Sequence, residues 1–514
     1  EIRFCDWSSD VCSSDLRKYL LASSTLIFAM GIMAGSASAD DFVIDQPVNQ
    51  TNGGFPIDDD DTLTVEATGA INTDADDENG IAAGNRNAIT NFGSIATVGS
   101  FANGIEAIDN NVIVNDGSIA TEGERAAGIA VGNDNSITNS GTISTTGLNA
   151  AGISARERNT ITNSGSIATT GAGAAGITVG STNTITNSGS IGTSGVQANG
   201  ISAGDVSTIT NLGSITTAGL QSNGMNAGNG NLLANSGSIS TTSVNADGIN
   251  AIDNNVITNS GSIATAGDLA VGIFVGSINE ITNTGTISTA GDDAAGIVAA
   301  SENLIINSGD IITTGDFADG LEVLDDNVII NSGSISAAGD GSIGIQAGDG
   351  NHITNSGDIS TVGNDASGIS VNDGNTIINS GSITAVDDGI SANDDNTVSN
   401  SGSITAREGI DAANNNTIAN SGSISAEDNA IEAENDNTIT NSGSIVAQNE
   451  AILVTDRNTI SNFGNITGFE GISANDLNTI TNSGNIAAVT NGIDVFDGNT
   501  ITNSGRIKIG RAHV

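Results

Sequence analysis

Carboxylate side chains are the groups in this sequence most able to do chemistry. The 514 residues include 59 Asp and Glu against 12 Lys and Arg, which gives a formal net charge of −47. Carboxylates at suitable spacing bind calcium, and residues 74–80 (DADDENG) loosely resemble such a loop. Their spacing differs from that of an EF-hand, and Asp and Asn are common in exposed turns. We therefore assign no metal or other cofactor, and calcium binding at acidic corners is an open alternative.

Side chains typical of catalytic sites are few. His352 is the one histidine inside the repetitive part of the chain, where other repeats carry Thr160 or Thr184, so we interpret it as a surface substitution. Enzymes that cleave acidic glycans need clustered carboxylates and usually an Arg or Lys to stabilise developing negative charge. The basic residues available for this role are scattered along the sequence: Arg156, Arg158, Arg407 and Arg457. The sequence therefore predicts that the chain is not an enzyme.

The two ends of the sequence resemble translated sequencing adaptor. Residues 10–15 (DVCSSD) back-translate to a DNA whose reverse complement encodes residues 509–514 (IGRAHV). We interpret residues 1–16 and 509–514 as adaptor-derived and exclude them from fold reasoning. Both cysteines, Cys5 and Cys12, lie in this excluded part, so no disulfide framework or thiolate metal site is predicted. The same interpretation predicts that the native chain continues beyond Lys508.

Residues 17–39 have the organisation of a secretory signal peptide. A short basic segment, Arg17 and Lys18, precedes an apolar stretch over residues 19–33, and Ala37-Ser38-Ala39 forms a small-residue cleavage site. The apolar stretch is shorter than the roughly 20 residues that a membrane-spanning helix needs. The sequence thus predicts export.

One glycine recurs with a regular period through the rest of the chain. The step is about 24 residues from Gly69 to Gly381 and about 20–21 residues from Gly381 to Gly505, and a fixed period in this range is the signature of a solenoid. The residues that we expect to stack from coil to coil as a structural ladder are Asn139, Asn163, Asn187, Asn235, Gly141, Gly165, Gly189, Gly237, Ile161, Ile167 and Ile177.

The local pattern predicts an all-β chain. Apolar residues alternate with period 2, β-branched residues are frequent, and Asn, Ser and Gly punctuate short strands. We expect a parallel β-helix over residues 69–508, with about 20 coils of 24 and then 20–21 residues, right-handed, and about 95 Å long from a strand spacing of about 4.8 Å. Residues 40–68, which depart from the repeat, are predicted to form an N-terminal cap. The residues that the shorter repeats lack come from the corner that reads TTGxx in the longer repeats, as at residues 169–173. The cross-section of the shaft should therefore narrow after residue 381.

The signal peptide, the Cys-free acidic array and coils of the NTITNSGSI type (residues 159–167) resemble the passenger region of bacterial autotransporters of the type V secretion class. The resemblance covers residues 17–508. It implies a protein exported through the periplasm to the outer membrane surface or the extracellular space. It also implies a C-terminal membrane β-barrel translocator as a partner, and we expect that this part is missing here by truncation.

Composition and resemblance together favour a structural and adhesive rod. Its expected partners are surface glycans, host or neighbouring-cell receptors, or other copies of itself, and the net charge of −47 excludes binding of nucleic acid through a basic face. A β-helix glycan lyase or hydrolase is one alternative. An ice-binding solenoid is another, because Thr160, Thr162, Ser164 and Ser166 are expected to point outward in rows.

Overall fold

The computed structural model describes residues 39–50 and 54–510, all of which lie within one compact unit. The predicted signal peptide (except Ala39) and most of the adaptor-like ends fall outside the described residues. In the described part the regular structure is entirely β, with 62 strands in three parallel sheets. The predicted all-β solenoid is therefore confirmed, while its right-handed sense stays a prediction.

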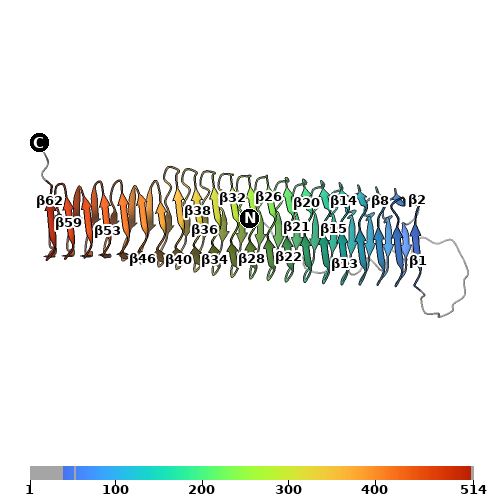
Figure 1. Cartoon of the computed structure of the whole chain (residues 1–514), viewed down its shortest axis with the longest axis horizontal. Helices are drawn as coiled ribbons and strands as arrows, with labels where there is room; N and C mark the ends of the chain where they lie inside the picture. Colours follow the sequence, from blue (N-terminus) through green and yellow to red (C-terminus); the bar gives the residue numbers. More distant parts are fainter. Residues whose placement is uncertain (1–38, 51–53, 511–514) are drawn as a thin grey trace, which may run out of the picture. The chain divides into compact units, whose positions relative to one another are not determined.

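Each coil contributes one strand to each sheet (Figure 1). The first coil consists of β1 (Asp41–Ile44), β2 (Pro47–Gln50) and β3 (Phe55–Ile57). Sheet A contains β1 and every third strand after it, to β61 (Thr500–Asn503). Sheet B runs in the same way from β2 to β62 (Arg506–Ile509), and sheet C from β3 to β60 (Ile493–Val495).

A typical coil contains two four-residue strands and one three-residue strand. In the coil that begins with β16 (Thr160–Asn163), β17 (Ser166–Thr169) and β18 (Ile177–Val179) follow. Side chains alternate inward and outward along each strand, as the pleat requires, so every second residue is buried. Ile161, Ile167 and Ile177 are at most 1% exposed and form continuous columns with their counterparts. Each buried aliphatic side chain contributes about 1.5–3 kcal/mol gross.

The coil length shortens after β43 (Thr376–Asn379). From β7 (Ala88–Asn91) through β43 the neighbouring strands of sheet A pair with a 24-residue offset, as in Asn355↔Asn379. Beyond β43 the coils are shorter, and the offset is 21 in Asn379↔Asn400 and 20 in Asn400↔Asn420. The predicted repeat lengths are therefore confirmed.

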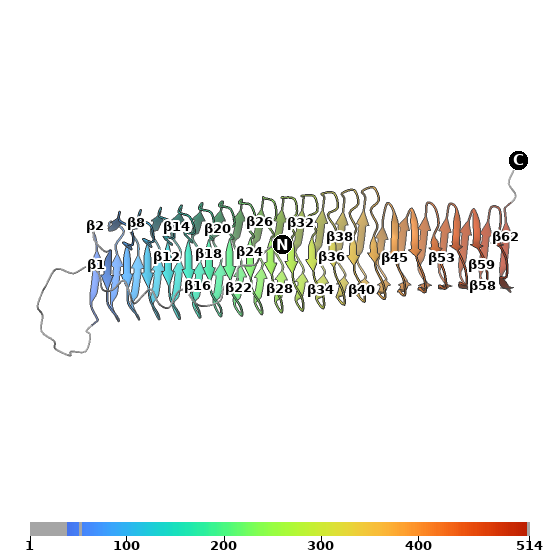
Figure 2. The ribbon, with the colours of Figure 1, turned by 180° about the vertical axis from the view of Figure 1, so that it is seen from behind.

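The lost residues come from the connection between sheets B and C, called the wide corner below. Residues 362–368 link β41 (Asp358–Thr361) to β42 (Ile369–Val371), whereas only residues 385–387 link β44 (Ser382–Thr384) to β45 (Asp388–Ala392). Figure 2 shows these loops protruding along one edge of the ribbon and stopping at the orange coils. The other two corners continue unchanged.

The segment predicted as a cap takes part in the ladder. β1 pairs in parallel with β4 (Thr62–Val65), and β2 pairs with β5 (Ala70–Thr73). Parallel pairing thus begins at Asp41, inside this segment, and its role as a cap stays a prediction. The corner after β4 is two residues longer than in later coils, so the register partner of Asn91 is Val65, although the 24-residue period counted from Gly69 points to Ala67.

Candidate functional site

The predicted asparagines Asn139, Asn163, Asn187 and Asn235 lie in one buried column at the end of the sheet A strands. Nδ2 of Asn139 donates to Oδ1 of Asn163 at 2.7 Å, and Nδ2 of Asn163 donates to Oδ1 of Asn187 at 2.7 Å. Every bond of this kind runs toward the next coil. A buried amide must have hydrogen-bond partners, and stacking in register supplies them from identical neighbours.

The predicted glycines Gly141, Gly165, Gly189 and Gly237 form a column at the corner between sheets A and B. A Cβ atom at Gly165 would lie 2.1 Å from the carbonyl oxygen of Gly141. Consecutive backbones therefore approach too closely for any side chain at this corner. The second glycine of the long repeats has a different role, because a Cβ at Gly176 would meet Cγ2 of Ile191 at 2.3 Å. There the missing side chain makes room for the isoleucine core.

A second asparagine column was not predicted. It lies four residues before the first, at the corner between sheets C and A. The backbone N–H of Asn135 donates to Oδ1 of Asn159 at 2.8 Å, and Nδ2 of Asn135 donates to the carbonyl of Ile108 at 3.0 Å. The residue before it, Asp134, has a φ of 59°, so the amide stabilises a corner with left-handed backbone. The sequence signal for this second column is the first Asn of the recurring NTITN motif, which is Asn159 in residues 159–163.

Buried threonines that were also not predicted close the wide corner. Oγ1 of Thr121 donates to the carbonyl of Ala126 at 2.5 Å, and the same contact recurs to Thr361, whose Oγ1 lies 2.8 Å from the carbonyl of Ala366. In the next coil the corner is short and Ala385 stands at this position. The long loop does not depend on the hydroxyl, because Ala337 occupies the threonine position in a coil whose wide corner, residues 338–344, is still long.

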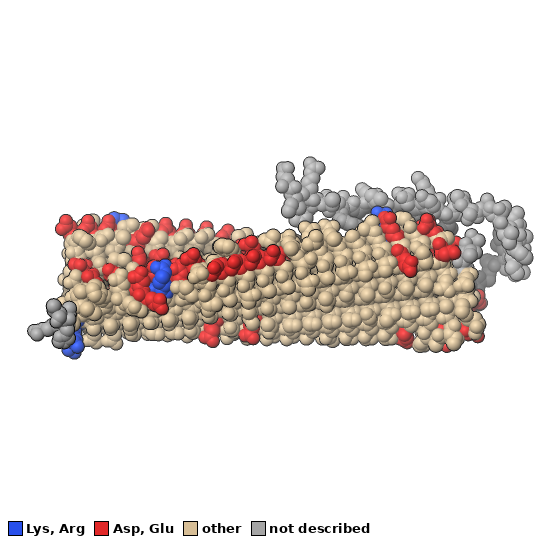
Figure 3. All heavy atoms as spheres, turned by 90° about the horizontal axis from the view of Figure 1, so that it is seen from above, with Lys and Arg blue, Asp and Glu red and all other residues tan. Residues whose placement is uncertain are grey.

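Acidic side chains stack at the wide corner. The backbone N–H of Asp316 donates to Oδ1 of Asp292 at 3.0 Å, and that of Asp340 donates to Oδ1 of Asp316 at 3.0 Å. Figure 3 shows acidic side chains aligned in a row along this part of the molecule. Hydrogen bonds from the backbone and side chain of Asn364 lower the pKa of the Asp340 carboxyl. Backbone donors thus offset the repulsion between neighbouring carboxylates.

The structure brings Arg407 into a cluster of carboxylates, although sequence reasoning treated it as isolated. Its Nη1 lies 2.5 Å from Oε1 of Glu408, its Nη2 contacts Asp387, and Oδ1 of Asp388 is 4.0 Å from Nη2. Burial, together with the charges of Asp387, Asp411 and Glu408, raises the pKa of Asp388 to about 7. Directly paired strands produce this arrangement, because Asp388 and Glu408 are register partners in β45 and β48 (Glu408–Ala412).

The other basic candidates lie at exposed corners. Arg158 makes two bonds of 2.9 Å to Asp134, one coil earlier, and Arg457 reaches Asp436 in the same way at 2.9 and 2.7 Å. Such exposed pairs contribute little to stability, because water and salt screen them. His352 is exposed in β40 (His352–Asn355).

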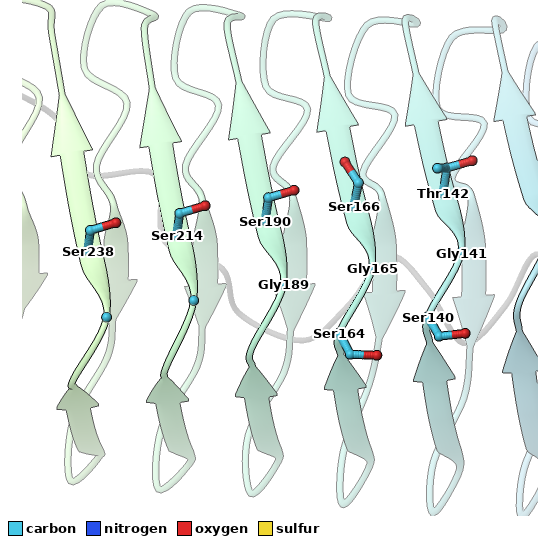
Figure 4. A pocket seen from close by; sticks show the side chains of 12 residues that line it. Ser140, Gly141, Thr142, Ser164, Gly165, Ser166, Gly189, Ser190, Ser214 and Ser238 are labelled. Carbon is cyan, nitrogen blue, oxygen red and sulfur yellow. The ribbon is translucent and has the colours of Figure 1, made fainter.

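A shallow crease of about 850 Å³ follows the corner between sheets A and B. It is lined by small residues of five consecutive coils, including Ser164, Gly165 and Ser166 (Figure 4). Figure 4 shows the serine hydroxyls at equivalent places in successive coils. The crease offers hydroxyl groups at the coil spacing, and its lining residues carry no charge.

A second, more enclosed groove of about 360 Å³ lies between the wide corner and the outer face of sheet C. Amide side chains dominate its polar lining, among them Asn103, Asn149, Gln197 and Asn199. Arg125 also lines it, and its guanidinium lies 5.6 Å from the ring centroid of Phe101. Amide and guanidinium groups can hydrogen-bond the hydroxyls of a polar ligand.

The described residues contain no group of three or more His, Cys, Asp or Glu placed to hold a metal ion. This includes residues 74–80, considered above as a calcium loop. Within the same residues no helix is long and apolar enough to cross a bilayer.

The chain is similar to several solved structures. The chain is similar to one in the cryo-EM structure of the Vag8–C1 inhibitor complex, with a TM-score of 0.43 and 14% identity over 91% of this chain and 100% of that one. It is similar to the PL6 family alginate lyase AlyGC, with a TM-score of 0.21 and 10% identity over 91% and 97% of the two chains. No family model and no curated protein matches the sequence. TM-scores this low carry no argument about function, so the assignment of this chain to the β-solenoids rests on its own strand pairing.

Proposed function

We propose that this chain is the shaft of an exported, surface-located structural and adhesive rod, the passenger part of an autotransporter. The observation that carries the proposal is the unbroken parallel pairing from β1 to β62, which repeats the same arrangement of strands at successive coils. A shaft of 20 strand spacings in sheet A, at about 4.8 Å each, reaches about 95 Å. The signal-like residues 17–39 and the acidic repeats support export and solubility.

The mechanism of adhesion is multivalent contact. The small-residue crease and the amide-lined groove both offer hydrogen-bonding groups that recur at the coil spacing. A ligand with its own repeats, such as a surface glycan, binds many modest sites at once, and the effective concentration of each further site rises with every contact. Host or neighbouring-cell receptors would be held in the same way. The membrane β-barrel translocator would present the shaft at the outer membrane.

Deleting whole coils tests this mechanism. Removal of residues 140–163 joins Asn139 directly to Ser164 and preserves the register of every remaining pair. Deletion of one, three and six such units should lower adhesion of protein-coated beads to cells progressively, since each deletion removes contacts. The exposed substitution Ser164→Ala, as the matched control, should leave adhesion within twofold. Loss of all adhesion on one exposed substitution would require a discrete site instead.

Cleavage of acidic glycans is the second candidate function, and the cluster around Arg407 favours it. A carboxyl whose pKa is raised to about 7, such as that of Asp388, can act as a general acid near neutral pH. A neighbouring guanidinium can stabilise negative charge. Purified protein is incubated with alginate and pectate, and new reducing ends and unsaturated products are measured. Turnover that Asp388→Asn abolishes, and that the exposed control Asp358→Asn retains, would establish the enzyme, and absence of turnover would exclude cleavage of these glycans.

A further inference from the structure

Two adjacent strands of sheet A carry large aliphatic side chains on their outer face. In β34 (Leu304–Asn307) and β37 (Val328–Asn331) both outward positions are aliphatic: Leu304, Ile306, Val328 and Ile330. We call these four residues the aliphatic patch. The equivalent outward positions in β16 are Thr160 and Thr162.

The patch is contiguous and open to solvent. Leu304 is the register partner of Val328, and Ile306 is the register partner of Ile330. Val328 is 38% exposed and Ile330 37% exposed, although tightly stacked strands cover much of each other's side chains. Among the described strands of sheet A, no other neighbouring pair has aliphatic residues at all four outward positions. Exposed apolar patches on an otherwise polar surface mark interaction sites.

Carboxylates border the patch on two sides. At the corner before sheet A lie the exposed Asp325 and Asp326, and at the crease side lies the exposed Asp310 of β35 (Asp310–Thr313). The sequence contains no Lys or Arg between Arg158 and Arg407. Among the described residues, no ion pair involves Asp310, Asp325 or Asp326. Within this part of the chain the Asp side chains of the rim therefore have no basic partner, while His352 and Thr354 lie beside Val328 and Ile330 on the next strand.

We propose that the aliphatic patch docks a cationic amphipathic segment of another protein. The apolar side of the segment would cover the four aliphatic side chains, and its Lys or Arg side chains would contact the acidic rim. This charge complementarity selects the partner, because desolvated apolar contact supplies affinity while opposite charges align the two surfaces. A second copy of the chain is disfavoured as occupant, since it carries the same rim and a formal net charge of −47.

This inference goes beyond the proposed adhesive function, because it places one partner at one pair of coils instead of along the shaft. Different experiments can refute the two proposals independently. Coil deletions outside residues 304–331 test multivalent adhesion and leave the patch in place. Substitutions in the patch leave every coil in place.

The test uses a fluorescein-labelled 14-residue helical peptide with Leu on one face and Lys on the other, titrated with the full chain and followed by anisotropy. A second peptide, with Ser in place of Leu, has the same charge. The Leu/Lys peptide should bind at least tenfold more tightly than the Ser/Lys peptide. The variant V328T/I330T should weaken its binding about tenfold, and D325N/D326N should weaken binding of both peptides. In D325N the side-chain oxygen that accepts the Asp349 backbone N–H at 2.8 Å remains.

The matched control is V112T/V114T, which makes the same kind of change in β10 (Val112–Asn115), where the neighbouring strands carry Ala88 and Ser136. It should leave binding within twofold. Threonine already occupies these positions in β16, so both variants should fold, and circular dichroism checks this. Equal binding of the two peptides, equal losses in V328T/I330T and V112T/V114T, or no binding at all would overturn the proposal. So would self-association, detected by sedimentation velocity, that V328T/I330T abolishes.

Discussion

Asn163 donates from Nδ2 to Oδ1 of Asn187 at 2.7 Å, and neither side chain is exposed to solvent. Asn163→Ala removes the acceptor of Asn139 and the donor to Asn187, so two buried polar groups lose a partner. Each such loss costs about 1–3 kcal/mol. We expect a decrease of about 2–4 kcal/mol in the free energy of unfolding of the coils around residue 163, measured by hydrogen exchange. Ser164→Ala, at the exposed neighbour, should leave exchange unchanged, and equal exchange in both variants would contradict the role of the ladder.

One corner glycine and one strand glycine distinguish close backbone approach from conformational freedom alone. Gly165→Ala would place a Cβ 2.1 Å from the carbonyl oxygen of Gly141, so the coils must move apart. We expect a loss of about 2–4 kcal/mol, which is in the range of severe core substitutions. Gly192→Ala meets no heavy atom within 4 Å and should be neutral or stabilising by about 0.4–1 kcal/mol. Urea unfolding of the two variants gives the comparison, and similar midpoints would contradict it.

The asparagine column begins with an unpaired acceptor. Within the described residues, Oδ1 of Asn91 is buried and has no hydrogen-bond partner, because its register partner in the preceding coil is Val65. Val65→Thr keeps the shape of the side chain and adds a hydroxyl donor beside that oxygen. We expect it to be neutral or to stabilise by about 0.5–1.5 kcal/mol.

The control for this prediction is Val398→Thr. Val398 is also fully buried, but it lies in the middle of β46 (Thr397–Asn400), within the aliphatic column of sheet A and beside Ile377 and Ile418. There a hydroxyl gains no acceptor of this kind and should cost about 1–3 kcal/mol. Thermal unfolding followed by circular dichroism ranks the two variants. An equal cost at both positions would show that the acceptor of Asn91 is already satisfied.

Asp319 makes the shaft sensitive to pH. It is 6% exposed and lies between Ala295 and Ile343 of the adjacent coils, and burial raises its pKa to about 7. The folded state therefore holds a proton that the unfolded state has lost, and this group's contribution to stability falls as pH rises from about 4 through 7. Asp319→Asn keeps the oxygen that accepts the Ile343 N–H at 2.7 Å and cannot ionise.

We expect Asp319→Asn to stabilise the surrounding coils by about 1–3 kcal/mol at pH 8 and to have little effect at pH 4.5. Hydrogen exchange of the Ile343 amide, measured at both pH values in the variant and the wild type, checks the difference. Asp358→Asn, an exposed acid on sheet B, serves as the control and should show no such difference. A stabilisation that is the same at both pH values would contradict the assigned pKa.

The periodic glycine predicted the fold because a constant offset leaves each residue above its counterpart. Gly141 and Gly165 recur at the same interval across which Asn139 and Asn163 pair. The Asn135 column escaped prediction because Asn before a strand is also an ordinary turn residue. The carboxylate cluster around Arg407 was not predicted, because Asp387 and Asp388 belong to the preceding coil. They lie near Arg407 only because β45 pairs with β48.

The first residues of the array show the limit of counting along the sequence. The ladder asparagine lies two residues before the periodic glycine, so counting back from Gly69 places the equivalent residue at Ala67. Two extra residues in the corner after β4 place Val65 there instead. Side-chain pairing across the strands, and not distance from the nearest glycine, decides which residue continues a column. Alignment of the repeat motifs along the sequence cannot show which corner contains the two extra residues.

The asparagine amides that stack from Asn91 to Asn503 all face the same way, each with its N–H groups directed at the following coil. Aligned amide dipoles add, as they do along an α-helix. The column therefore has a negative pole at the carbonyl oxygen of the Asn91 amide and a positive pole near Asn503. A shaft built from nearly identical coils is thus electrically polar along its axis.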